Sequence, residues 1–187
     1  MNTPREAIVS DITRPPGTAS PGSSPGATIY RGGHPFQARV DTIRFLKERV
    51  EGNRAMAAVE FEDTDAQPWY CVIGAVQRPD GSWKVDGATS GRGRSEPQAR
   101  GPWANFGGWG WPRFLCLGGR VHGEGVSKVR LIDAAGRTVE DTVEDGLALL
   151  VFNAPVEMPC QIELRDADGA LVATQRWPPE RGVRSRR

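Results

Sequence analysis

The chain has 187 residues, of which 38% are hydrophobic and 25% charged, and its formal net charge is +1. These values are typical of a globular protein, and they exclude both a disordered polyampholyte and a nucleic-acid binder that depends on bulk positive charge. Arginine outnumbers lysine by 21 to 3, but the arginines are spread along the whole chain. We therefore interpret this bias as GC-rich coding in a bacterium, and we expect no nucleic-acid partner.

Residues 11–33 are rich in proline, glycine and serine and offer little that a core could bury. This composition predicts a flexible leader over residues 1–33. The leader lacks the apolar run that a secretory signal needs. The longest apolar run of the chain, residues 147–152, is far shorter than the roughly 18 residues that cross a bilayer. We expect a cytoplasmic protein without a membrane partner.

The segment 34–52 predicts the one helix of the chain. Its apolar residues recur at helical spacing, and they are Phe36, Val40, Ile43, Leu46 (or Phe45) and Val50. Pro35 suits the first turn of a helix, where its missing N–H costs nothing. Gly52 suits the left-handed residue that follows the last turn. We expect an amphipathic helix that lends one stripe of side chains to a core.

After this helix the chain predicts strands and turns. Residues 55–63, 68–77 and 82–89 are apolar or alternating runs with β-branched and aromatic members. The sequence Pro-Asp-Gly at 79–81 predicts the turn of a hairpin between two of these runs. Residues 88–102 are polar and rich in glycine and arginine, and they predict a loop that divides the chain into two parts.

The second part has a more regular rhythm. Residues 126–177 contain five short strand patterns, separated by turn signals at intervals of about eight to twelve residues. This spacing is typical of an antiparallel sandwich or barrel. We predict a mainly β fold: an antiparallel β-sandwich, immunoglobulin-like or similar, with one N-terminal amphipathic α-helix packed against it.

The predicted organisation is one globular domain over residues 34–177. It would consist of a helix-plus-hairpin part over 34–90 and a regular sandwich part over 103–177. Residues 178–187 contain the run RGVRSRR, and they predict a basic flexible tail, because short basic runs of this kind are usually solvated.

Two acidic stretches raise the question of catalysis or metal binding. Residues 139–146, VEDTVEDG, predict a strand at an exposed sheet edge, where acids discourage pairing with other chains. Residues 165–171, RDADGAL, begin like a calcium loop, but Trp177 stands where the final glutamate of such a loop would fall. The similar turn at 132–138 has alanine in place of the second acid. We predict hairpin turns, no metal and no cofactor.

The cysteines and histidines give only one candidate pair. Cys71, Cys116 and Cys160 lie in apolar surroundings without a CxxC spacing, which predicts buried reduced thiols. His34 and His122 are too few and too far apart for a usual metal site. Cys116 and His122 flank a Gly-Gly pair that would turn a hairpin, so they are the nearest candidates for a nucleophilic pair.

Residues 101–119, GPWANFGGWGWPRFLCLGG, gather three of the six tryptophans among glycines. Trp109 and Trp111 are two residues apart, so in an extended chain both rings would project to one face. Flat rings on one face can form a binding platform. Alternatively, they close the core, and the glycines mark bends. The candidate ligand- or partner-binding residues are Trp103, Phe106, Trp109, Trp111 and Arg113.

These observations favour a non-enzymatic protein that acts through contacts with another protein, because no assembled nucleophile, metal motif or phosphate motif is found. One alternative is a carbohydrate-binding module that uses Trp103, Trp109 and Trp111. A second alternative is an enzyme with a site near Cys116 and His122.

Overall fold

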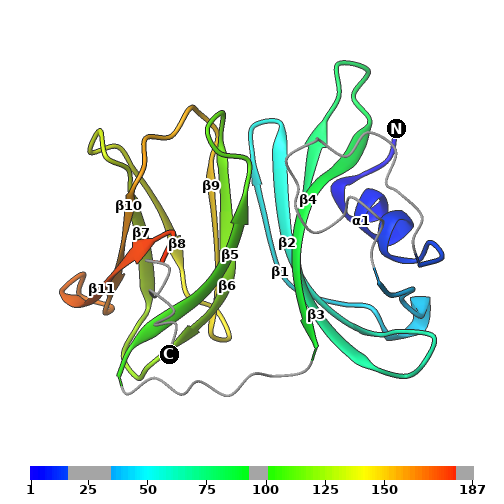
Figure 1. The fold of residues 1–187 in the computed structure, drawn as a ribbon, viewed down its shortest axis with the longest axis horizontal. Helices are drawn as coiled ribbons and strands as arrows, with labels where there is room; N and C mark the ends of the chain where they lie inside the picture. The colour runs from blue at the N-terminus through cyan, green and yellow to red at the C-terminus, as the bar shows by residue number, and fades with distance from the viewer. Residues whose placement is uncertain (17–34, 93–100, 180–187) are drawn as a thin grey trace, which may run out of the picture.

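The computed structural model describes residues 1–16, 35–92 and 101–179. These residues form three antiparallel sheets and one short α-helix near the N-terminus (Figure 1). The prediction of a mainly β chain is therefore confirmed. Most of the expected leader (17–33), most of the expected loop (93–100) and most of the expected tail (180–187) lie outside the described residues.

The strands follow a simple order in each sheet. The first sheet has the order β1-β2-β3-β4, with β1 (Arg44–Glu51), β2 (Arg54–Glu62), β3 (Pro68–Gln77) and β4 (Trp83–Arg92). The second has the order β5-β6-β9, with β5 (Trp103–Trp109), β6 (Leu115–His122) and β9 (Leu147–Phe152). The third has the order β11-β10-β7-β8, with β7 (Lys128–Ile132), β8 (Thr138–Thr142), β10 (Cys160–Arg165) and β11 (Leu171–Trp177).

The sheets lie face to face, with the second sheet between the other two and the helix on the outer face of the first (Figure 1). The three strands expected over 55–89 are confirmed as β2, β3 and β4, and the five expected over 126–177 as β7 to β11. The predicted hairpin between β3 and β4 is also present, and its Gly81 has a φ of +80°.

The helix α1 (Pro4–Ile12) lies within the segment expected to be a flexible leader. A capping box starts it: the Thr3 hydroxyl accepts the N–H of Glu6, and the Glu6 carboxylate accepts the N–H of Thr3. Ile8 and Ile12 are buried against side chains of the first sheet. The N-terminal residues are thus packed on the sheet.

The prediction of a helix over residues 34–52 is wrong. Residues Val40–Thr42 form a single 3₁₀ turn, η1, and the residues that follow form β1. β1 is an edge strand that pairs antiparallel with β2 from Arg44 to Glu51. Pairing with β2 outweighs the local helical spacing, because it lets Phe45 and Leu46 pack into the cores on the two faces of the first sheet.

The misleading spacing has a local cause. The register with β2 shifts between Phe45 and Lys47, so the chain carries a bulge there. Phe45 packs on the helix side of the sheet and Leu46 on the opposite side, as alternation along a strand requires, and the bulge places Lys47 on the same side as Leu46. Apolar residues on two faces of a strand therefore mimic one helical stripe. Gly52 has a positive φ of +58°, but it serves the turn between β1 and β2.

The second sheet is buried on both faces, and β9 shows this most clearly. All six of its residues are buried. Leu149 and Val151 pack with Met56 of the first sheet, whereas Leu150 and Phe152 pack with residues of the third. A strand covered on both faces is apolar at every position, which explains why this sequence shows no alternation.

Replacement of Ile8 by alanine should lower the free energy of unfolding by about 2–5 kcal/mol, because its side chain fills the core between α1 and the first sheet. Urea denaturation measures the change. Ser10→Ala, at an exposed position of the same helix, is the control and should change stability by less than about 0.5 kcal/mol. Equally small effects of both would contradict the packing of α1.

Candidate functional site

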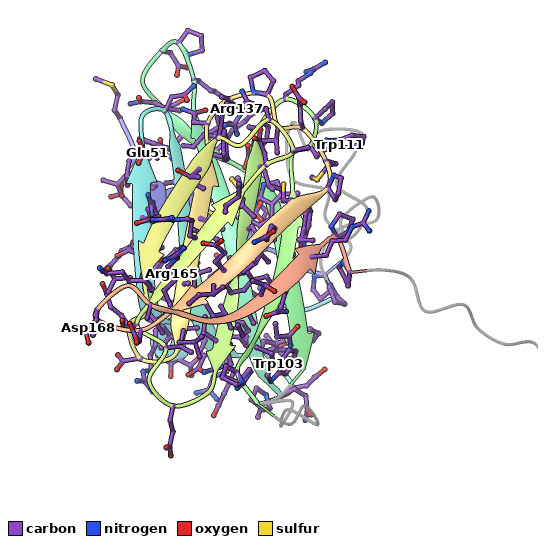
Figure 2. The ribbon with its side chains drawn as sticks, turned by 90° about the vertical axis from the view of Figure 1, so that its left-hand side faces the viewer. Glu51, Trp103, Trp111, Arg137, Arg165 and Asp168 are labelled. Atoms are coloured by element: carbon purple, nitrogen blue, oxygen red, sulfur yellow. The ribbon has the colours of Figure 1, made fainter. Side chains whose placement is uncertain are left out.

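The tryptophans of the 101–119 stretch do not form one platform. Trp103 begins β5 and Trp109 ends it, and Figure 2 shows Trp103 and Trp111 at opposite ends of the molecule. Gly110 has a φ of +104°, which turns the chain between Trp109 and Trp111. The extended geometry that would give these two rings a common face is therefore absent.

Trp109 is held between the first and second sheets. Its ring lies against Gly74 and Gly87 so closely that a Cβ at either glycine would overlap it. Its Nε1 donates a hydrogen bond to Asp86 at 3.4 Å. Burial raises the pKa of Asp86, and the guanidinium of Arg54, which contacts the same carboxylate, opposes the rise. The two glycines thus make room for an aromatic ring in the core.

The remaining candidate residues have different surroundings. Phe106 packs against the core between the second and third sheets. Trp103 stacks on His122 with ring centroids 4.9 Å apart. Trp111 is 55% exposed, and Arg113, in the same loop, is exposed too. The role of these five residues in binding stays a prediction, and only Trp111 and Arg113 present their side chains openly to a partner.

The expected hairpin between Cys116 and His122 is not formed. Both residues belong to β6, and their spacing of six residues corresponds to about 20 Å at ~3.3 Å per residue. Burial raises the pKa of the Cys116 thiol, which keeps it protonated and weakly nucleophilic. These two side chains therefore do not form a nucleophilic pair.

The acidic stretch at 139–146 begins as predicted, since β8 is the edge strand of the third sheet. One of its acids, Asp141, has a role that the sequence did not indicate. Its carboxylate pairs with Lys47 at 2.8 Å and with Arg49 at 3.3 Å, both from β1. The Lys47 side chain is 4% exposed and that of Asp141 is 12% exposed. On the amphipathic helix expected over residues 34–52, Lys47 would instead lie outside the apolar stripe and face solvent.

The same side chains also form hydrogen bonds with backbone groups of two edge strands, β8 and β9. Lys47 donates to the carbonyl of Thr142, and Arg49 donates to the carbonyl of Glu140 at 2.6 Å, both in β8. The carboxylate of Asp141 accepts the N–H of Leu149, in β9, at 2.7 Å. Backbone groups that a further strand could otherwise use are therefore occupied by side chains.

Two amide side chains form similar hydrogen bonds with backbone groups of the edge strands β4 and β5. Asn2 donates to the carbonyl of Trp83 at 3.0 Å and accepts its N–H at 2.8 Å. Gln175 donates to the carbonyl of Ala104 at 3.1 Å and accepts its N–H. A side-chain amide offers one acceptor and donors side by side, so it reproduces the exchange of a hydrogen-bonded strand pair.

Strand β11 differs from these edges. Among the described residues it pairs on one side only, with β10. Leu171 is 55% exposed and Val172 is 38% exposed. The outer face of the third sheet, which faces away from the second sheet, is turned towards the viewer in Figure 2.

An open groove of about 590 Å³ adjoins the second half of β11. It lies across three neighbouring strands of the third sheet and is lined by Thr174, Gln175 and Arg176 of β11, by the beginning of β10 and by the end of β7. Asp133 also lines the groove. Burial opposes its ionisation, but hydrogen bonds from the side chain and N–H of Arg137 outweigh this and lower its pKa. The groove therefore combines apolar and charged groups.

Replacement of Asp141 by asparagine should lower the free energy of unfolding by about 3–5 kcal/mol, because it leaves the charge of Lys47 buried without its partner. Guanidinium denaturation measures the loss. Glu144→Gln is the matched control, since Glu144 is 3.8 Å from the same lysine but 65% exposed. This control should change stability by less than about 1 kcal/mol. Similar losses in both variants would contradict the special role of Asp141.

Within the three described segments, no His, Cys, Asp and Glu side chains gather in a group that would hold a metal ion. None of the helices described is long and apolar enough to cross a membrane. Comparison of the chain with protein-family models, with curated proteins and with solved structures gives no match.

Proposed function

We propose that this protein is a non-enzymatic binding protein that takes up an extended segment of another protein as an additional strand beside β11. The observation that carries the proposal is the contrast between β11 and the other edge strands. Side chains occupy backbone groups of β4, β5, β8 and β9. Among the described residues, β11 pairs as a strand only with β10 and has exposed apolar side chains, and its contact with β5 is made through the side chain of Gln175. Addition of a strand to a free edge is a common mode of peptide recognition.

The composition of β11 supports this choice over the edge strand β1, whose backbone contacts a side-chain amide only at its last residue, where Asn153 donates to the carbonyl of Glu51 at 3.5 Å. β1 carries charged side chains at five of its eight positions, which discourages pairing. β11 carries one charge, that of Arg176, in seven residues. Of the two strands, β11 is the better acceptor for a partner strand.

The groove beside β11 supplies a source of specificity. Backbone hydrogen bonds bind any extended peptide, so discrimination depends on where alternate side chains of the peptide are placed. The groove lies on the β10 side of β11, so a long side chain of a strand added at the free edge would reach it across Thr174 and Arg176. The loop with Trp111 and Arg113 extends this surface, since the carbonyl of Pro112 accepts the N–H of Val156 at 3.0 Å, shortly before β10.

Charge suggests the chemistry of the partner. Arg176 lies in β11, Arg113 is exposed, and the sequence that follows the strand includes RGVRSRR at 181–187. Opposite charge favours encounter and fixes orientation. We therefore infer that the partner segment is extended, with apolar residues at alternate positions and acidic residues at its flank.

The proposal includes a fold type and a location. We propose that β5 to β11 form an immunoglobulin-like sandwich, supported by their arrangement as a three-stranded and a four-stranded antiparallel sheet around one core. A cytoplasmic location is supported by three free, buried cysteines, because reduced thiols are usual in that compartment.

The test selects eight-residue peptides from a random phage-displayed library on the full chain. Selected peptides should alternate apolar and polar residues and carry acidic flanks. Val172→Glu should weaken binding of a synthetic selected peptide by about tenfold or more, because it places a charge of the wrong sign on the edge. Fluorescence anisotropy measures the affinity. Val50→Glu makes the same change at an exposed position of β1 and should leave the affinity unchanged.

A second measurement separates strand addition from simple hydrophobic contact. N-methylation of the peptide at every second residue removes the N–H groups that face one side while it keeps the side chains. One of the two alternating patterns should abolish binding, and the other should not. Failure to select any peptide, equal effects of both patterns, or full binding to the Val172→Glu variant would overturn the proposal.

A further inference from the structure

A second pocket, of about 350 Å³, lies on the first sheet and is independent of β11. Its lining has polar residues and apolar parts of Phe61, Pro68 and Trp69, and the polar ones are Thr42, Arg44, Glu60, Glu62 and Tyr70. Arg44 is the register partner of Glu60, and Glu60 is the register partner of Tyr70. Directly paired residues of neighbouring strands project to the same face, so these three side chains form a row.

The second sheet contributes a cation to this row. Arg120, from β6, pairs with the carboxylate of Glu60 at 2.7 Å. Its guanidinium carbon also lies 4.7 Å from the centre of the Tyr70 ring. The carboxylate of Glu60 is therefore neutralised inside the protein, and it offers little to a cationic ligand.

Two groups of the pocket lack partners. The hydroxyl of Tyr70 is buried and forms no hydrogen bond. Arg44 is exposed and forms no ion pair or hydrogen bond with any described residue. Burial raises the pKa of Tyr70 to about 12, so the hydroxyl is a donor at neutral pH. A buried donor without an acceptor is costly in a folded protein and is uncommon unless a ligand or water satisfies it.

We propose that this pocket binds a small organic carboxylate with an apolar or aromatic body. The carboxylate accepts the O–H of Tyr70 and pairs with the guanidinium of Arg44, while the body contacts the apolar wall at Pro68 and Trp69. Glu60 pairs with Arg120 and Glu62 pairs with Arg39, so the guanidinium of Arg44 is the unpaired charge of the lining, and it matches a monoanion. A phosphate dianion would bring a second negative charge that the single unpaired guanidinium of Arg44 does not balance, so carboxylate is preferred over phosphate.

The test titrates the full chain with benzoate, phenylacetate and 4-phenylbutyrate, and with inorganic phosphate at equal ionic strength. The indole N–H resonance of Trp69, which donates to Asp63 at 2.7 Å, reports binding in the pocket. At least one of the carboxylates should shift this resonance in a saturable manner and raise the melting temperature. Phosphate should do neither.

Two variants and a control locate the ligand. Arg44→Gln, at an exposed position that preserves packing, should weaken carboxylate binding by about tenfold or more. Tyr70→Phe should weaken it similarly, yet raise the melting temperature of the free protein, because it removes the unsatisfied hydroxyl. Arg78→Gln, an exposed arginine in the β3–β4 turn, should leave binding unchanged.

Three results would overturn the proposal. They are the absence of binding by all three carboxylates, a preference for phosphate, and carboxylate binding that Arg44→Gln and Arg78→Gln affect equally. A Tyr70→Phe variant that is less stable than the parent protein and binds as tightly would also overturn it, since the hydroxyl would then serve the fold alone.

Discussion

The ion pair between Lys47 and Asp141 joins all three sheets at a point from which water is largely excluded. Lys47 belongs to the first sheet and Asp141 to the third, and Asp141 also accepts an N–H from Leu149 in the second. A buried charge is tolerated only with a partner in good geometry. This requirement fixes the position of β1 relative to β8 and β9 far more narrowly than the apolar contacts between the sheets would.

A sheet buried on both faces imposes a second constraint. The faces of the second sheet are mainly apolar, with the pair of Arg120 and Glu60 as a polar contact towards the first sheet, and further polar groups that align the layers lie at strand edges. Side chains from other layers, among them Arg49, Asn2 and Gln175, bind the backbone there. The layers are thus joined by apolar contacts between their faces and by hydrogen bonds at the edges of the sheets. The proposed partner site is the edge of β11, where no hydrogen bond from a described side chain occupies the strand backbone.

Much of the strand content could be predicted from sequence, because alternation and turn residues are local signals. The runs at 55–63 and 68–77 and the Pro-Asp-Gly turn are examples. The helix is misplaced, since Phe45 and Leu46 on opposite faces of β1, together with the exposed Val40 and Val50, imitate helical spacing. The sequence signal for the helix that does form is the capping box from Thr3 to Glu6. The pairs of Lys47 with Asp141 and of Tyr70 with Arg120 join distant segments, and no local pattern indicates such contacts.

The hydrogen bonds of Asn2 with Trp83 and of Gln175 with Ala104 make two strand edges sensitive to deamidation of these side chains. An amide serves the N–H and the carbonyl of one residue at once only because it presents a donor beside an acceptor. Asparagine and glutamine are thermolabile residues. Deamidation of Asn2 or Gln175 would replace the donor by a charged oxygen that faces the carbonyl of Trp83 or Ala104. Slow replacement of the amide nitrogen by oxygen would thus free the backbone groups of a strand edge that the intact amide occupies.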